Sequence, residues 1–211
     1  MTTAAEMIEK QLRARGIRDE RVLEAMLRIP REQFVPEDLR DQAYSDAPLP
    51  IGFGQTITQP YMTALMAQSL ALSGEEKVLD VGTGSGYHAA VLGALARRVI
   101  SIERIPELVV LARSNLMRTG LDKNITVVCG DGSLGWPEEA PFDAISVAAA
   151  SPYMPQPLLN QLRDPGTLVI PIGPREDQDL RVVRKENGRI SARAASACRF
   201  VPLLGSHGFQ E

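Results

Sequence analysis

The stretch VLDVGTGSGY, residues 78–87, decides the fold of this 211-residue chain. A short apolar run typical of a buried strand leads directly into three alternating glycines, Gly82, Gly84 and Gly86, and then into a helix-like run. Glycines let the backbone approach a ligand closely, and a helix that begins there presents unpaired N–H groups. The stretch therefore predicts a ligand-binding turn between a strand and a helix.

Strand-like and helix-like runs alternate on both sides of this turn. Apolar strand-like runs at 77–82, 98–103 and 125–130 are separated by longer helix-like runs. Strands that alternate with helices predict a parallel sheet covered on both faces. We expect an α/β fold with a doubly wound, mostly parallel sheet.

The two ends of the chain have other patterns. Residues 4–29 predict two amphipathic helices separated by Gly16, and the proline-rich residues 30–60 predict a long loop with one short helix. Asn187-Gly188 lies between two short strand-like runs, which predicts a C-terminal β-hairpin. We expect one domain over 1–211, with N-terminal helices and loop (1–60), an α/β core (61–175) and C-terminal strands (176–211).

The spacing of the glycines favours a ligand with a cationic group over a dinucleotide. The dinucleotide fingerprint is G-x-G-x-x-G, whereas here the third glycine comes one residue early and Asp80 precedes the turn. A carboxylate beside a pyrophosphate would repel it, but would suit an amino group or a sulfonium.

Two further acids follow the next two strands. Glu103 ends a strand at a place where an acid can accept hydrogen bonds from both hydroxyls of a ribose. Asp131, in the sequence GDG at 130–132, could accept from an adenine amino group, and Gly132 would let the ring lie against the backbone. An adenosyl ligand, S-adenosyl-L-methionine, fits this set better than NAD, and an NAD-dependent dehydrogenase is the disfavoured alternative.

Composition excludes several function classes. The net charge of -3 argues against a nucleic-acid partner, and no apolar run reaches the roughly 20 residues of a membrane helix. Cys129 and Cys198 have neither disulfide nor metal-ligand spacing, so we expect buried thiols and a cytoplasmic location. His88 and His207 have no cysteine or carboxylate cluster around them, so we expect no metal.

The segment GQTITQP, residues 54–60, is too polar for a core strand and predicts a loop whose side chains contact a ligand. It belongs to a longer stretch, PLPIGFGQTITQPYM at 48–62, that closely resembles the protein-L-isoaspartate (D-aspartate) O-methyltransferase family. The resemblance extends over nearly the whole chain. It includes PREQFVP at 30–36, the glycine turn, SIERI at 101–105, GDG, PFDAISVAAA at 141–150 and RFVPLLG at 199–205.

The resemblance implies methyl transfer from S-adenosyl-L-methionine to the free carboxylate of L-isoaspartyl or D-aspartyl residues in damaged proteins and peptides. It makes residues 54–60 the loop that holds the substrate carboxylate. Thr58 stands where the family usually has the active-site serine, and Ala148 where it commonly has threonine. We expect retained activity with an altered rate, and a monomer.

These arguments predict two sets of site residues. The cofactor set is Gln55, Thr56, Ile57, Asp80, Gly82, Thr83, Gly84, Ser85, Gly86, Glu103, Arg104, Asp131 and Gly132. The substrate set is Ile57, Thr58, Val147 and Ala148, with Thr58 as the catalytic residue. Asp80 and the glycines would hold the methionine end of the cofactor.

Two alternatives to a repair methyltransferase stay open. One is a module that binds isoaspartyl sites and the cofactor but transfers methyl groups poorly. The other is a methyltransferase that acts on another acceptor, since a fold does not fix its substrate. For the tail RFVPLLG we expect a packing role, and the sequence leaves open whether the tail also covers the cofactor.

Overall fold

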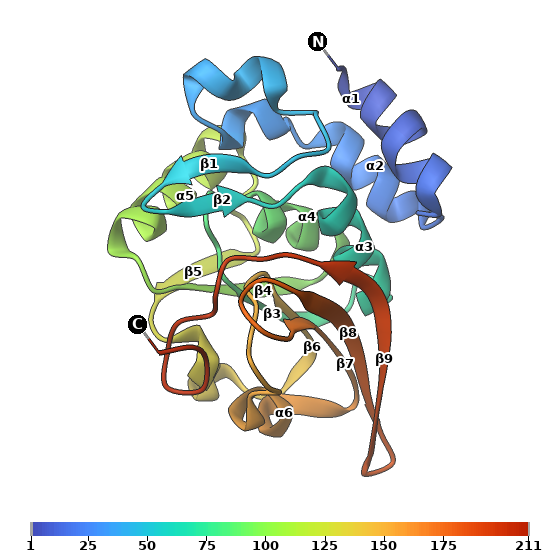
Figure 1. Ribbon diagram of the computed structural model, residues 1–211, viewed down its shortest axis with the longest axis vertical. Helices are drawn as coiled ribbons and strands as arrows, with labels where there is room; N and C mark the ends of the chain where they lie inside the picture. The colour runs from blue at the N-terminus through green and yellow to red at the C-terminus, as the bar shows by residue number, and fades with distance from the viewer. Residues whose placement is uncertain (1, 211) are drawn as a thin grey trace.

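The computed structural model describes residues 2–210, which form a seven-stranded sheet flanked by helices and a separate two-stranded ribbon (Figure 1). The strands are β1 (Leu49–Gly52), β2 (Gln55–Ile57), β3 (Lys77–Val81), β4 (Arg98–Glu103), β5 (Ile125–Cys129), β6 (Phe142–Val147), β7 (Leu162–Ile172), β8 (Gln178–Glu186) and β9 (Arg189–Cys198).

The α-helices are α1 (Ala4–Glu6), α2 (Glu20–Arg28), α3 (Pro60–Leu70), α4 (Tyr87–Leu95), α5 (Pro106–Thr119) and α6 (Gln156–Gln161). A π-helical segment η1 (Met7–Leu12) continues α1, and the short 3₁₀ turns are η2 (Arg13–Arg15), η3 (Arg31–Phe34), η4 (Glu37–Gln42), η5 (Gly132–Leu134) and η6 (Pro137–Glu139).

The large sheet has the strand order β5-β4-β3-β6-β7-β8-β9. Strands β3 to β7 pair in parallel, and β8 and β9 are added antiparallel. The prediction of a doubly wound, mostly parallel sheet with a C-terminal hairpin is therefore confirmed. The chain leaves β3 toward β4 on one side, while β6 joins β3 on the other. A crevice opens at the carboxyl ends of strands where the order reverses in this way.

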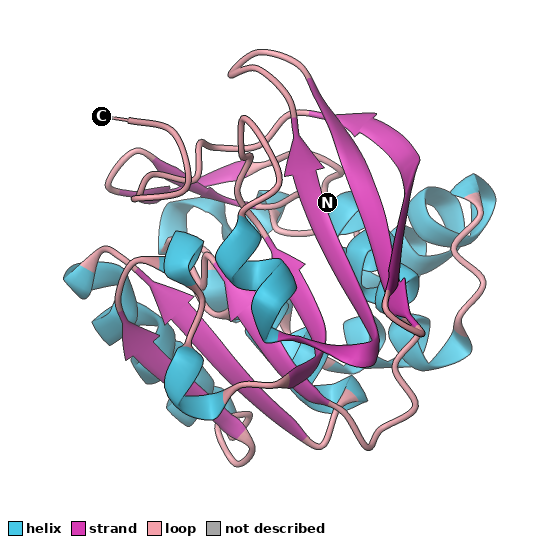
Figure 2. Cartoon of the chain, turned by 90° about the horizontal axis from the view of Figure 1, so that it is seen from below, coloured by secondary structure: helices cyan, strands magenta, loops and turns pink. Residues whose placement is uncertain are grey.

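The sheet is covered on both faces, as Figure 2 shows. One buried apolar cluster joins the N-terminal helices with α3, α4 and α5, and a second joins the opposite face with α6. Along β3, Val78 belongs to the first cluster and Leu79 and Val81 to the second, as the alternation of a strand requires. Asp80 thus takes a core position between apolar neighbours, which is unusual for a carboxylate.

Local signals start and end elements near both ends of the chain. The Asp19 side chain accepts hydrogen bonds from the backbone N–H groups of Arg21 and Val22 and caps α2. The turn between β8 and β9 is Asn187-Gly188, with φ values of 52° and 72°.

Two sequence predictions are wrong. Residues 55–57 do not form a loop but strand β2, whose antiparallel pairing with β1 satisfies backbone groups while Leu49, Ile51 and Ile57 pack into the core. Cys129 is exposed and Cys198 half-buried, so neither thiol is a buried core residue; both are free. Within residues 2–210, no helix combines the length and apolar character that crossing a membrane requires.

Candidate functional site

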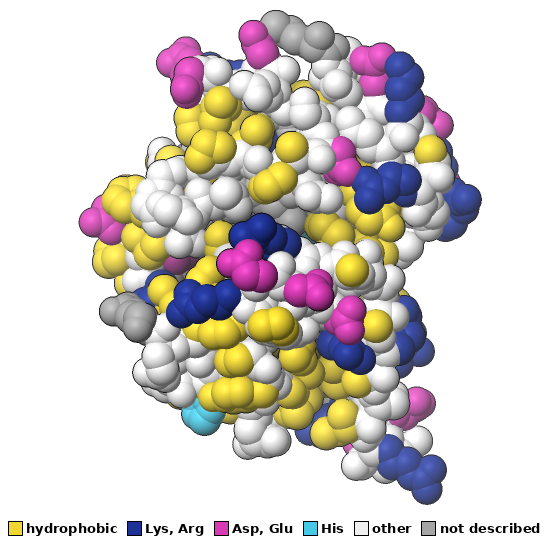
Figure 3. Space-filling view, viewed as in Figure 1, with side chains coloured by type: hydrophobic (Ala, Val, Ile, Leu, Met, Phe, Trp, Pro, Cys, Tyr) yellow, Lys and Arg dark blue, Asp and Glu magenta, His cyan; other side chains and the backbone are white. Residues whose placement is uncertain are grey.

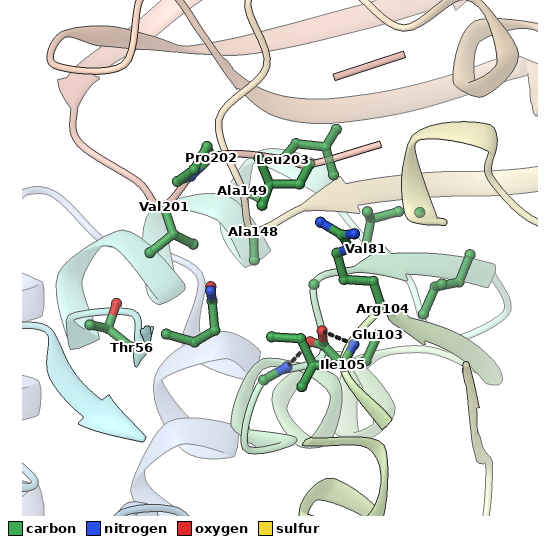
Figure 4. Close-up of a pocket in the computed structure, with 16 residues that line it drawn as sticks. Thr56, Val81, Glu103, Arg104, Ile105, Ala148, Ala149, Val201, Pro202 and Leu203 are labelled. Carbon is green, nitrogen blue, oxygen red and sulfur yellow. Dashed lines mark hydrogen bonds between the residues drawn. The ribbon is translucent and has the colours of Figure 1, made fainter. Parts of the chain in front are cut away.

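A cavity opens at the carboxyl ends of β3, β4 and β6, beneath the β1–β2 ribbon (Figure 4). Its space measures about 690 Å³, including the part open to solvent. The residues that line it are Gln55, Thr56, Val81, Gly82, Gly84, Ile102, Glu103, Arg104, Ile105, Gly132, Ala148, Ala149, Val201, Pro202, Leu203 and Leu204.

The glycine turn forms the floor of this cavity. The three glycines have positive φ values of 92°, 55° and 94°, which side chains rarely adopt. The N–H groups of Gly82 and Thr83 donate to the Ile102 carbonyl, and that of Gly84 donates to the Glu103 carboxylate at 2.9 Å. The amides of Gly82, Thr83 and Gly84 therefore already have partners within the protein.

Glu103 is the best-placed acid in the cavity. Its side chain is 7% exposed, and its two carboxylate oxygens accept from the backbone N–H groups of Gly84 and Ile105 at 2.9 and 3.0 Å (Figure 4). Each oxygen keeps a lone pair for a further donor. Two adjacent hydroxyls of a ribose could donate to them.

Asp80 lies below the turn and does not line the cavity. Its side chain is fully buried; Oδ2 accepts from the Ser101 hydroxyl at 2.7 Å, whereas Oδ1 has no hydrogen-bond partner within residues 2–210. Burial raises the pKa of Asp80 to about 7, and the nearby Glu103 adds to the rise. In this conformation Asp80 can influence a cationic ligand through its field rather than by contact.

Asp131 also lies off the cavity wall, in an adjoining hollow with Trp136. Its carboxylate accepts from the Ser133 N–H and hydroxyl and from the Ser206 N–H at 2.8 Å. These hydrogen bonds lower the pKa of Asp131. The residue therefore fastens the C-terminal tail, and its contact with adenine stays a prediction. Its neighbour Gly132 does line the cavity, where an added Cβ would lie 2.4 Å from Val81.

Thr58 lies in two smaller hollows beside the main cavity. Thr56 and Ala148 line all three spaces, so the hollows and the cavity share a wall. Within the described chain no protein group hydrogen-bonds the Thr58 hydroxyl. His88 lines one hollow, but it contacts Ser146 at 2.9 Å and burial lowers its pKa to about 4, so it is neutral at pH 7.

The structure thus brings together most of the predicted site. The predicted residues on the cavity wall are Gln55, Thr56, Gly82, Gly84, Glu103, Arg104, Gly132 and Ala148. Those beside the smaller hollows are Ile57, Thr58, Thr83 and Ser85. Asp80, Gly86, Asp131 and Val147 line none of these three spaces.

Sequence reasoning missed the wall formed by the tail. Val201, Pro202 and Leu203 lie opposite Glu103 and Ile105 across the cavity (Figure 4), so the tail does more than pack. The apolar run FVPLL after the last strand was the available signal. Among residues 2–210 no cluster of three or more histidines, cysteines or carboxylates could hold a metal ion.

Comparisons with known proteins agree with this geometry. Residues 2–208 match the family model of protein-L-isoaspartate (D-aspartate) O-methyltransferases. The chain is 54% identical to protein-L-isoaspartate O-methyltransferase of Methanoculleus marisnigri, with 97% of this chain and 93% of the relative covered. It is 57% identical to protein-L-isoaspartate O-methyltransferase 2 of Marinobacter nauticus, with 96% and 93% covered.

Solved structures give the same result. A protein-L-isoaspartate O-methyltransferase matches with a TM-score of 0.86 and 28% identity, over 98% of this chain and 67% of the other. A putative member from Plasmodium falciparum, in complex with S-adenosyl-L-homocysteine, matches with a TM-score of 0.81 and 30% identity, over 97% and 99%.

Proposed function

Because the chain belongs to the protein-L-isoaspartate (D-aspartate) O-methyltransferase family, we propose that it methylates the free carboxylate of L-isoaspartyl and D-aspartyl residues in damaged proteins and peptides. The methyl donor is S-adenosyl-L-methionine. The observation that carries this proposal is the shared wall between the Glu103 cavity and the Thr58 hollows, which lets a donor and an acceptor meet at Thr56 and Ala148.

The residues of the cavity fit the adenosyl donor. When bound, the donor supplies a methyl group on a cationic sulfur. Glu103 would hold the ribose, and Gly132, which packs too closely on Val81 to carry a side chain, would present its backbone to the adenine ring. In its ionised form, Asp80 below the turn would favour a cationic centre above it.

The acceptor needs no general base. A carboxylic acid with a pKa of about 4 is already ionised at neutral pH, so its oxygen can attack the methyl carbon directly. The attack displaces the sulfur and cancels one positive and one negative charge. Orientation of the carboxylate and exclusion of water therefore supply the acceleration. We assign orientation to the Thr58 hydroxyl and to the segment Gln55–Ile57 that leads into it.

The product begins a repair. In the methyl ester of an L-isoaspartyl residue, the backbone nitrogen of the following residue attacks the ester carbonyl and expels methanol. A succinimide results, and hydrolysis at either carbonyl gives a normal aspartyl or an isoaspartyl residue. Repeated rounds convert the damaged residue toward aspartate.

We further propose that the chain works as a monomeric single domain in the cytoplasm, on protein and peptide substrates rather than nucleic acid. Its two free cysteines suit a reducing compartment. Figure 3 shows basic and acidic side chains interspersed on the face seen there, which does not favour a polyanion.

The test is methyl-ester formation from labelled S-adenosyl-L-methionine on a short L-isoaspartyl peptide, with the aspartyl peptide of the same sequence as control. We expect transfer to the isoaspartyl peptide alone. Cofactor binding without transfer to either peptide would replace the proposal with a binding module or another acceptor.

A further inference from the structure

Arg31, in the turn η3, is one of the largest side chains that the core buries completely. Within residues 2–210 no carboxylate forms an ion pair with it, and its Nη1 atom has no hydrogen-bond partner. Asp46 acts on the guanidinium electrostatically without forming an ion pair. A charge buried in this way is costly, and an apolar side chain of similar volume often serves stability as well or better. The position of this guanidinium therefore calls for a reason other than stability.

The guanidinium joins three segments that are distant in sequence. Its Nε donates to the carbonyl of Ala43 at 2.7 Å, and its Nη2 donates to the carbonyl of Thr58, also at 2.7 Å. Its plane lies over the ring of Tyr87, 4.6 Å from the ring centre. Tyr87 is the first residue of α4, directly after the glycine turn. Arg31 thus connects the Thr58 segment with the helix that follows the cofactor turn.

The hydrogen bond to Thr58 is the main support of that residue. The carbonyl of Thr58 has one other donor, the Thr63 hydroxyl, at a long 3.5 Å. Threonine is stiff about its first side-chain torsion, so the backbone position largely decides where its hydroxyl points. Tyr87 lines the same hollow as Thr58 and gives the guanidinium a fixed, buried surface.

We propose that Arg31 is a positioning residue for methyl transfer, which fixes the Thr58 hydroxyl relative to the cofactor turn. The proposal rests on the role of Thr58 given above. Arg31 need not contact either substrate, because it acts through the backbone of Thr58. Misplacing a catalytic group by about 1 Å can lower a rate on the order of 100-fold. Loss of the hydrogen bond from Arg31 to the Thr58 carbonyl should therefore reduce kcat without changing the cofactor site.

Arg21 offers a control for the loss of the planar fork. Its guanidinium also bridges two backbone carbonyls, those of Leu72 and Leu95, and so joins α2 to the core, but it lines none of the three spaces of the site. A lysine in either position keeps the charge and loses the planar fork. Arg21 is exposed whereas Arg31 is fully buried, so Arg21→Lys controls for the loss of the planar fork at a site remote from Thr58, and Arg31→Met below addresses the buried charge.

The experiment compares Arg31→Lys, Arg21→Lys, Thr58→Ala and the double variant of Arg31→Lys with Thr58→Ala. For each, kcat and KM are measured with the L-isoaspartyl peptide, and the Kd for S-adenosyl-L-homocysteine is measured by calorimetry. We expect Arg31→Lys to lower kcat on the order of 10- to 100-fold, with the Kd within about twofold of the parent. Arg21→Lys should keep kcat within about twofold, and Arg31→Lys should have little further effect once Thr58 is alanine.

Three results would overturn the inference: an unchanged kcat in Arg31→Lys, the same fractional loss in the Thr58→Ala background, or a parallel loss of cofactor affinity. If Arg31→Lys does not fold, Arg31→Met, which removes the buried charge, is measured in the same way. Failure of both variants to fold would assign Arg31 to stability alone. Absence of transfer by the parent chain would instead reject the proposed function, so the two failures are distinguishable.

Discussion

Replacing Glu103 with alanine should weaken cofactor binding through the ribose. The carboxylate is nearly buried, and the Gly84 and Ile105 amides hold it in place, so it needs no reorganisation to accept from a hydroxyl. Hydrogen bonds to a charged group contribute about 1.5 to 3 kcal/mol each. Since about 1.4 kcal/mol is a factor of ten, each lost bond raises the Kd for S-adenosyl-L-homocysteine about 10- to 150-fold, so the loss of both hydroxyl contacts should raise it by at least that factor.

Titration calorimetry with S-adenosyl-L-homocysteine measures this loss, and Glu107→Ala is the control. Glu107 is an exposed acid in the first turn of α5, so its removal takes away a nearby charge without touching the cavity wall. Its Kd should stay within about twofold of the parent, because an exposed charge is well screened.

A second ligand separates the ribose contact from damage to the glycine turn. An analogue of S-adenosyl-L-homocysteine without the 2′-hydroxyl should bind the parent more weakly, but should bind Glu103→Ala as well as the full ligand does. If the variant still discriminates between the two ligands by the same factor, or if its Kd equals that of the parent, Glu103 does not hold the ribose.

Three further predictions concern the acceptor side, the buried acid and the tail. Thr58→Ala should lower kcat while the Kd for S-adenosyl-L-homocysteine stays unchanged, and Thr58→Ser, which keeps the hydroxyl, should keep turnover; equal losses in kcat and affinity for Thr58→Ala would make the residue structural. Because burial raises the pKa of Asp80 from 3.8 to about 7, the folded state binds this proton more tightly than the unfolded state, and its contribution to stability is lost as the pH rises from about 4 to about 7. Asp80→Asn should therefore gain stability relative to the parent as the pH rises from about 5 to about 8, by about 1.4 kcal/mol for each pH unit below the pKa of the folded state. Urea unfolding at the two pH values measures this gain, and the same difference in unfolding free energy between variant and parent at both values would contradict the assigned pKa. Asp131→Ala removes the acceptor of the Ser206 N–H, so hydrogen exchange in the tail should speed up and S-adenosyl-L-homocysteine should dissociate faster in stopped flow, and unaltered exchange would show that other contacts hold the tail.

Much of the fold and part of the site follow from the sequence because their signals are local. Alternating strand and helix patterns predicted the sheet, and the glycines with Glu103 predicted the floor of the cavity. The same local logic failed for residues 55–57, because this three-residue strand carries a single buried apolar side chain, Ile57, and is fixed by its pairing with β1.

Other features depend on contacts that no local pattern encodes. The tail joins the cavity only because β8 and β9 return it to the carboxyl end of β3, and Asp131 is engaged by residues that follow those strands. Asp80 was predicted at the ligand because it precedes the turn, yet strand alternation directs its side chain into the core.

The cavity wall at Val201–Leu204 also has a consequence for the order of folding. Units such as β3-α4-β4 involve neighbours in sequence and can form early, whereas the wall opposite Glu103 closes only after the antiparallel strands have been added. A partly folded chain would therefore possess the glycine turn without a site that retains its ligand. Recovery of S-adenosyl-L-homocysteine binding during refolding should lag behind recovery of helical signal, so the ligand itself serves as a reporter of the last long-range contacts to form.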